Sequence, residues 1–171
     1  MLYYIKYAVL HKIYIIYKIY NIYINMILIK QKVIMFIVMV IVGVFFNPMN
    51  ILAYRLSDLY LSLTLFYGGL LMASNMMWAH EIVHYLSMGH FNKYIFLLGI
   101  FLSVTVSLFI LRKQLFVNDR EWLKRMISHH STALTTSKNI YNKTKNKKIK
   151  QLAKDIIITQ EKEITQMKSM L

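Results

Sequence analysis

Apolar residues gather in long blocks along this chain, and charged residues are confined to the stretches between the blocks. Between Val33 and Leu111 the only lysine or arginine residues are Arg55 and Lys93. A helix needs about 20 apolar residues to cross a bilayer at a rise of ~1.5 Å per residue. The pattern therefore predicts an integral, multi-pass membrane protein with about three transmembrane helices, near residues 33–54, 59–80 and 94–111.

The periodicity changes after the third apolar block. Asn118, with Glu121 three residues on, is a helix-starting arrangement in which side chains satisfy free backbone N–H groups. Apolar positions then recur at steps of three and four to about Tyr141, a polar run fills 142–148, and a second amphipathic run begins at Ile149. We therefore expect an all-α chain that ends in an antiparallel helical hairpin.

These patterns divide the chain into three parts. Residues 1–32 are a low-complexity run of Tyr, Ile and Lys, residues 33–114 form the membrane domain, and residues 115–171 form the hairpin domain. Lys6, Lys12 and Lys18 point in three directions on a helix, so the first part has no clean apolar face. We expect it to lie along the membrane surface. Met26 is an alternative start, which leaves the place of residues 1–25 in the mature protein open.

The charge is +14 and belongs to the extramembrane parts, because 14 Lys and Arg against five acids follow from Arg112 onward. Such a surface is either attracted to anionic lipid headgroups or simply solvated, and no specific nucleic-acid partner is predicted. Lys30 and Lys32 favour a cytoplasmic N-terminus, whereas Arg112 and Lys113 favour the opposite orientation. Since the first span usually dominates, we expect an extracytoplasmic C-terminal domain.

The chain has no cysteine, which excludes disulfides and thiolate metal sites. Folding the hairpin about Thr144 brings a set of polar and thioether side chains together on the apolar stripe. Imidazole and thioether groups are soft ligands that suit copper, particularly Cu(I). The alternative is a hydrogen-bonded network, for instance between His130 and Glu163. The predicted metal ligands are Met126, His129, His130 and Met167, with Gln160 and Glu163 orienting the imidazoles.

The same residues carry a family resemblance. The stretch Met126-Ile-Ser-His-His130, followed by Leu152-Ala153, Ile156-Ile157, Gln160, Glu163-Ile164 and Met167, resembles the domain-of-unknown-function 305 family, whose pattern is roughly MIPHH and then LA..II..Q..EI..M. Some members have three spans before a motif of the type MIPHHS.AI.TS, so the resemblance runs from about Val33 to Leu171.

This resemblance implies a ferritin-like helical fold, here a half-bundle, and binding of copper or silver through His and Met. Ser128 departs from the family, which usually has proline at that position, but both histidines are kept. A hairpin of this length cannot bury a sizeable core alone. We therefore predict a homodimer in which two hairpins form a four-helix bundle.

A second group of candidate ligands lies at the end of the second predicted span. Met72, Met76, His80, His84 and Met88 are each four residues apart, which gives a slowly drifting ladder along one helix side. Met76, His80 and His84 are a possible second metal cluster able to pass copper along the membrane. The alternative is that the methionines fill an apolar helix and the histidines lie at the interface.

The run His80-Glu81-Ile82-Val83-His84 also matches the HExxH pattern of zinc proteases, in which the glutamate activates water. A catalytic zinc needs a third protein ligand, and the next acid is Asp119, beyond the third span. The leading prediction is therefore a non-catalytic copper-binding or tolerance protein of the membrane. An intramembrane zinc metalloprotease and a structural membrane protein without a ligand are the alternatives.

Overall fold

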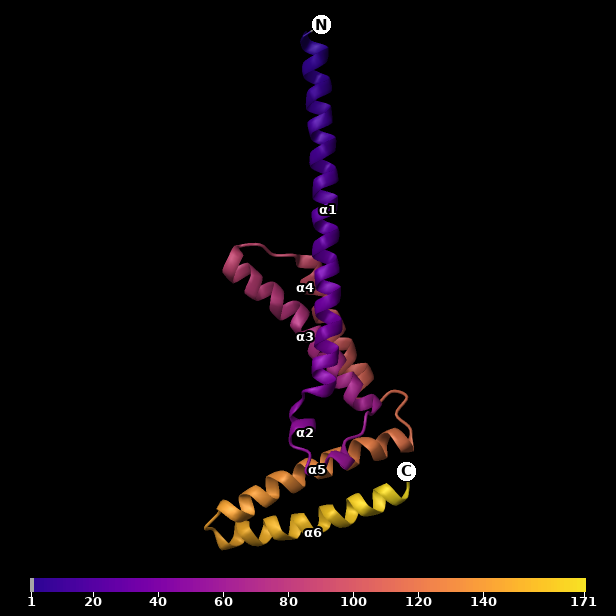
Figure 1. Ribbon diagram of the computed structural model, residues 1–171, viewed down its shortest axis with the longest axis vertical. Helices are drawn as coiled ribbons and strands as arrows, with labels where there is room; N and C mark the ends of the chain where they lie inside the picture. Colours follow the sequence, from indigo (N-terminus) through magenta and orange to yellow (C-terminus); the bar gives the residue numbers. More distant parts are fainter. Residues whose placement is uncertain (1) are drawn as a thin grey trace.

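The computed structural model describes the backbone from Leu2 to Leu171 and the side chains of residues 10–24 and 26–171. The direction predicted for Lys6 lies outside the described side chains. The described chain is helical and contains no strand, which confirms that the fold is all-α (Figure 1). In chain order the elements are α1 (Leu2–Phe45), α2 (Pro48–Ile51), the 3-10 turn η1 (Leu56–Asp58), α3 (Leu63–Met88), α4 (Lys93–Thr105), the π-helical turn η2 (Val106–Leu111), α5 (Asp119–Lys143) and α6 (Lys147–Ser169).

The first helix differs from its prediction at both ends. It runs without a break through residue 32, so the low-complexity segment and the first apolar block form one helix of 44 residues. At ~1.5 Å per residue this helix is about 66 Å long, roughly twice the thickness of a bilayer core. It ends at Phe45 and not at Tyr54, because the Asn47 side chain accepts the N–H groups of Met49 and Asn50 and starts α2 at Pro48.

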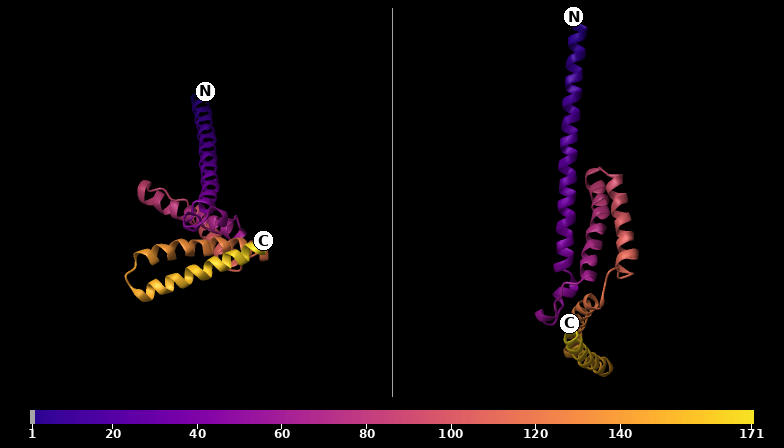
Figure 2. Two further views of the ribbon diagram at one scale, coloured as in Figure 1. Left: turned by 60° about the horizontal axis from the view of Figure 1, so that its bottom comes forward. Right: turned by 90° about the vertical axis from the view of Figure 1, so that its right-hand side faces the viewer.

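Three helices pack side by side through glycine. Figure 2 shows α3 and α4 running along the C-terminal half of α1, whose N-terminal half extends beyond them. A Cβ atom on Gly43 of α1 would lie 2.7 Å from the Cα of Gly69 on α3, and one on Gly99 of α4 would lie 2.8 Å from the Trp78 backbone nitrogen. These backbones therefore approach as closely as small residues allow. Gly68, the neighbour of Gly69, faces open space.

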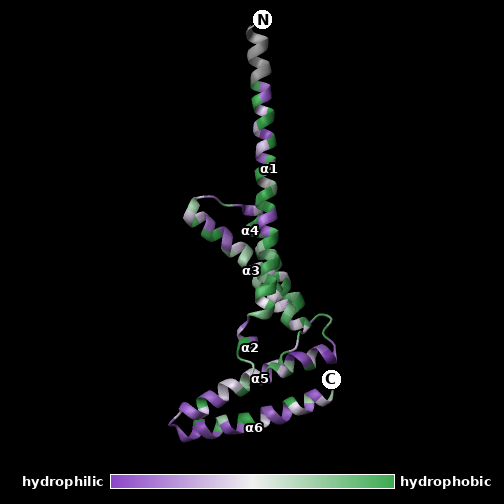
Figure 3. Cartoon of the chain, viewed as in Figure 1, coloured by the Kyte–Doolittle hydropathy of each residue, from purple (hydrophilic) through white to green (hydrophobic). Residues whose placement is uncertain are grey.

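Two helical segments are long and apolar enough to cross a membrane, Leu10–Ile51 and Lys93–Leu111, with mean hydropathies of 2.3 and 2.5. The second predicted span corresponds to α3, which begins four residues later than expected because Ser62 caps it by accepting the Leu65 N–H. Polar residues such as Asn75 and His80 lower the hydropathy of α3. Figure 3 shows that apolar residues dominate the packed helices and that the hairpin is mixed.

The C-terminal part is a pair of antiparallel helices lying across the end of the three packed helices (Figure 1). Asn118 caps α5 by accepting the Glu121 N–H, and Asn146 caps α6 by accepting the N–H groups of Lys148 and Ile149. The turn between them is therefore only residues 144–146. The hairpin core is small and consists of Leu123, Ile127, Leu134, Ile164 and Met167.

Candidate functional site

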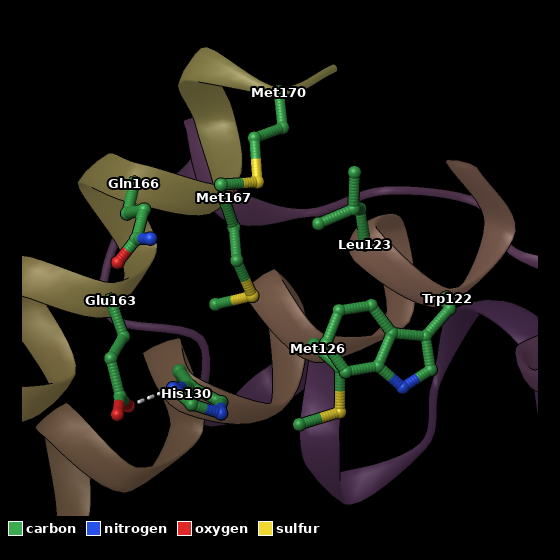
Figure 4. A pocket seen from close by; sticks show the side chains of 8 residues that line it. All are labelled: Trp122, Leu123, Met126, His130, Glu163, Gln166, Met167 and Met170. Atoms are coloured by element: carbon green, nitrogen blue, oxygen red, sulfur yellow. Dashed lines mark ion pairs between the residues drawn. The ribbon is translucent and has the colours of Figure 1, made fainter. Parts of the chain in front are cut away.

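A pocket of about 290 Å³ lies between the first turns of α5 and the last turns of α6 (Figure 4). Its lining residues recur at steps of three and four on each helix, so the amphipathic spacing places them on facing sides of an antiparallel pair. The pocket brings together four of the six side chains predicted from the sequence and adds others that the pattern did not single out. It is lined by Trp122, Leu123, Met126 and His130 of α5 and by Glu163, Gln166, Met167 and Met170 of α6.

His130 is the one histidine that lines the pocket, and it lies next to the carboxylate of Glu163. Its Nδ1 atom lies 3.0 Å from Oε2 of Glu163, close enough for an ion pair (Figure 4). The ring is not aligned for a hydrogen bond, however, and Nδ1 is buried without an acceptor or donor in good geometry. Burial lowers the pKa of His130 more than Glu163 raises it. The lowered pKa favours the neutral imidazole, which is the form that binds metals.

Two of the predicted residues lie outside the pocket lining. His129 is exposed, with its ring 5.8 Å from that of His130. Gln160 donates through Nε2 to Oε2 of Glu163 at 3.4 Å, so it contacts the residue that contacts His130. This position suits the orienting function predicted for Gln160.

The donor set fits a soft metal ion. The pocket lining includes three thioethers, those of Met126 on α5 and of Met167 and Met170 at the end of α6, together with the imidazole of His130. Among the side chains of residues 10–24 and 26–171, no group of three or more His, Asp or Glu is arranged to hold a metal ion. Zinc and other borderline ions prefer nitrogen, thiolate and carboxylate ligands, whereas thioethers select Cu(I) and similar ions.

The second predicted cluster is built differently from a metal site. The rings of His80 and His84 stack with centroids 5.9 Å apart, and Lys32 of α1 reaches Nδ1 of His80 at 2.8 Å. Glu81 is 2% exposed and forms an ion pair with Lys32 through Oε1, while its Oε2 accepts the Asn92 N–H at 3.1 Å. Both carboxylate oxygens thus hold helices together, and neither is free to activate water.

Met76 is half-buried on α3, and Met72 and Met88 are exposed. No third His, Asp or Glu ligand joins His80 and His84 in the described chain. The zinc-protease alternative therefore stays a prediction that this geometry does not favour.

The residues that sequence reasoning missed connect the hairpin to the segment between α1 and α3. Asp58, fully buried, accepts from the Ser131 hydroxyl at 2.7 Å and pairs with Lys168 at 2.6 Å. The Ser128 hydroxyl donates to the Asp58 carbonyl and accepts the Tyr60 N–H. Asp58 marks only the edge of an apolar block in the sequence, so no local signal identifies its partners.

Ser128 therefore has a structural function in this chain at the position where the resemblance leads one to expect proline. Ser128 and Ser131 flank the His129–His130 pair, and Lys168 follows Met167. One face of the hairpin lines the pocket while the other binds the segment between α1 and α3.

Comparisons with known proteins agree with this division of the chain. Residues 111–171 match the description "Domain of unknown function (DUF305)". An uncharacterized protein of Acanthamoeba polyphaga mimivirus is 36% identical over 145 residues, which is 83% of this chain and 92% of the viral protein. No solved structure matches the chain significantly. The similarity to the viral protein thus extends well beyond the hairpin.

Proposed function

The chain belongs to the domain-of-unknown-function 305 family, and on that premise we propose that it is a membrane-anchored protein that binds Cu(I) in its C-terminal hairpin, for buffering or tolerance and not for catalysis. One observation supports this function above all. The hairpin pocket combines three thioethers with an imidazole whose pKa is lowered by burial, and its Nδ1 has no aligned hydrogen-bond partner.

The anchor in this proposal has three membrane-crossing helices. α1 and the α4–η2 segment are long and apolar enough to cross, and α3 packs against both of them. Two polar side chains of α3, those of Ser74 and Glu81, are buried within the packed helices, whereas Asn75 is exposed. Three crossings place the hairpin on the side opposite the N-terminus, and we propose that this side is extracytoplasmic.

The hairpin pairs with a second copy in this proposal. Its core of five buried apolar side chains is small, and Ile149 and Leu152 of α6 are 44% and 60% exposed. Two hairpins packed through such faces form a four-helix bundle, which buries more apolar surface per chain.

The metal proposal is tested on the full chain in detergent by titration with Cu(I), Ag(I) and Zn(II) against a chromogenic chelator. Leucine replaces methionine with little change in volume but without the sulfur atom. We expect the Met126→Leu/Met167→Leu variant to bind Cu(I) at least about tenfold more weakly than the native chain. Met39→Leu, in α1, is the matched control and should bind as the native chain does.

Variants of the two histidines distinguish Cu(I) binding in the pocket from binding elsewhere on the hairpin. We expect His130→Ala to weaken Cu(I) binding strongly and His129→Ala to weaken it less, because only His130 lines the pocket. Native-like circular dichroism would show that the variants are folded. A folded native chain that binds no Cu(I), or that prefers Zn(II), would overturn the proposal.

A further inference from the structure

A groove separates two of the membrane-domain helices. α1 and α4 both pack on α3, and between them they leave a groove of about 380 Å³. One face of α1 from Ile29 to Phe36 forms one wall, Ile95, Leu98 and Leu102 of α4 form the other, and Met77 of α3 forms the floor. No described element of the chain covers it, since Ile29 is 60% exposed and Leu98 is 49% exposed.

The lining is apolar apart from Lys32. An open apolar groove lacks the dispersion contacts that a packed interior makes, so an apolar occupant stabilises it. If these helices cross a bilayer, as proposed above, the groove opens to lipid, and acyl chains are the most abundant apolar groups there.

Positive charge gathers at one end of the groove. Lys32 of α1 lines the groove, and Lys93 begins α4 next to Asn92, whose N–H binds Glu81. Glu81 is paired with Lys32, whereas Lys93 forms no ion pair within the described part of the chain. From Tyr94 to Leu111 along α4 and η2 there is no charged residue. The groove therefore combines a cationic end with an apolar length, which matches the chemistry of an anionic amphiphile.

We propose that this groove binds one acyl chain of an anionic phospholipid, with the phosphate headgroup at the lysine end. The inference rests on the proposed membrane anchor and is independent of copper. Lys93 attracts the headgroup, and Lys32 lines the groove with its aliphatic stem while its ammonium group stays on Glu81.

The test uses the full chain reconstituted in nanodiscs of phosphatidylcholine with a minority of phosphatidylglycerol, released into detergent and weighed by native mass spectrometry. We expect one retained phosphatidylglycerol per chain. Leu98→Trp fills the groove and should reduce retention at least about tenfold. Leu97→Trp, at the preceding residue, is the matched control, because Leu97 is 59% exposed and does not line the groove.

Headgroup selection is tested with Lys93→Gln, which should retain phosphatidylcholine and phosphatidylglycerol equally. Retention by Leu98→Trp equal to that of the native chain would overturn the inference, as would a native chain without preference between the two lipids. Photocrosslinking from Leu98 to a second copy would also overturn it, by assigning the groove to a protein interface. Extraction of the chain from membranes by alkaline carbonate would instead refute the membrane anchor, so the two failures are distinguishable.

Discussion

Asp58 is the side chain on which the orientation of the hairpin depends. It is fully buried, and its carboxylate contacts Ser131 of α5 and Lys168 of α6, so one residue of the connecting segment holds both hairpin helices. A buried ion pair contributes little net stability compared with an apolar pair, but removing one partner leaves an uncompensated charge. Asp58 therefore fixes the orientation of the hairpin more than it adds to the stability of the fold.

Replacing Asp58 by asparagine tests this interpretation. Asparagine keeps a hydrogen-bond acceptor for Ser131 but leaves Lys168, whose side chain is 30% exposed, without its carboxylate, so we expect the free energy of unfolding of the hairpin to fall by about 1–2 kcal/mol. Urea titration followed by Trp122 fluorescence, in a Trp78→Phe background, measures it. Lys154→Gln, an exposed lysine of the same helix, is the control. Equal stability of Asp58→Asn and the native chain would show that the contact is dispensable.

Spacing alone identified much of the candidate site at this scale. Met126, His130, Glu163 and Met167 are predictable because an antiparallel pair of helices with a short turn fixes which positions meet. Met170 was not predicted, because it follows the last regular position of α6. His129 was included because adjacent residues in sequence cannot be separated without knowing the rotation of α5 about its axis.

At the scale of elements, close helix packing depends on single glycines. Gly69 meets the α1 backbone, since a Cβ there would lie 2.8 Å from the Val40 carbonyl oxygen, whereas a Cβ on Gly68 would meet nothing. The pair thus offers two adjacent positions on one helix with opposite environments.

We expect Gly69→Ala to destabilise the membrane domain by about 1–3 kcal/mol, because α1 must move away from α3. Gly68→Ala should be neutral or stabilising by up to about 1 kcal/mol, since alanine favours the helix. Unfolding in SDS, followed by Trp78 fluorescence in a Trp122→Phe background, compares them. If both variants lost the same stability, the close approach would not be the cause.

Glu121 joins the start of α5 to the start of α3. Its Oε2 accepts the Leu63 N–H at 2.7 Å, and its Oε1 pairs with Lys124 at 2.6 Å. The hydrogen bond from Lys124, followed by that from Leu63, holds the pKa of Glu121 below 4.5. A carboxylate whose pKa is lowered by folding stabilises the fold at pH values above its pKa in the unfolded chain. This contribution disappears as the pH falls through the pKa of the folded state.

The melting temperature of the native chain should therefore fall below pH 4.5 more steeply than that of Glu121→Gln, and differential scanning fluorimetry in detergent measures both. At pH 7 the variant should melt lower than the native chain, because it lacks the charge that Lys124 and the Leu63 N–H group bind. If the melting temperatures of the two proteins fell in parallel with pH, this function of Glu121 would be contradicted.

Helix limits were predictable where a cap was visible in the sequence. Asn118 marks the start of α5 correctly, whereas the first apolar block gave Tyr54 as its end because apolar residues continue past Phe45. Hydropathy does not register that Asn47 accepts two N–H groups and ends the helix. The continuity of α1 through residue 32 was missed because charge, and not helix propensity, suggested the boundary.

For the whole molecule, the arrangement of three packed helices and a crosswise hairpin makes the topology testable. The loop between α3 and α4 lies at the end of the packed helices opposite the hairpin (Figure 2). In the proposed orientation this loop is cytoplasmic and the hairpin turn is extracytoplasmic.

The absence of native cysteine makes single introduced cysteines unique labels. With an impermeant maleimide we expect Thr144→Cys to react in intact cells and Ser87→Cys to react only after permeabilisation. The reverse labelling result would show that the chain has the opposite orientation in the membrane. Labelling of both residues from one side would refute the crossing of α4.

The contacts of Asp58 with the hairpin have a consequence for how the chain could be assembled. The hairpin is joined covalently through residues 112–118, but Asp58, Leu63 and Met49 bind it through a separate part of the chain. The peptide between α4 and α5 is therefore not the only link. Two fragments divided near Lys113 should associate when co-expressed, so the protein can be studied as a split pair whose reassembly reports on the docking surface itself.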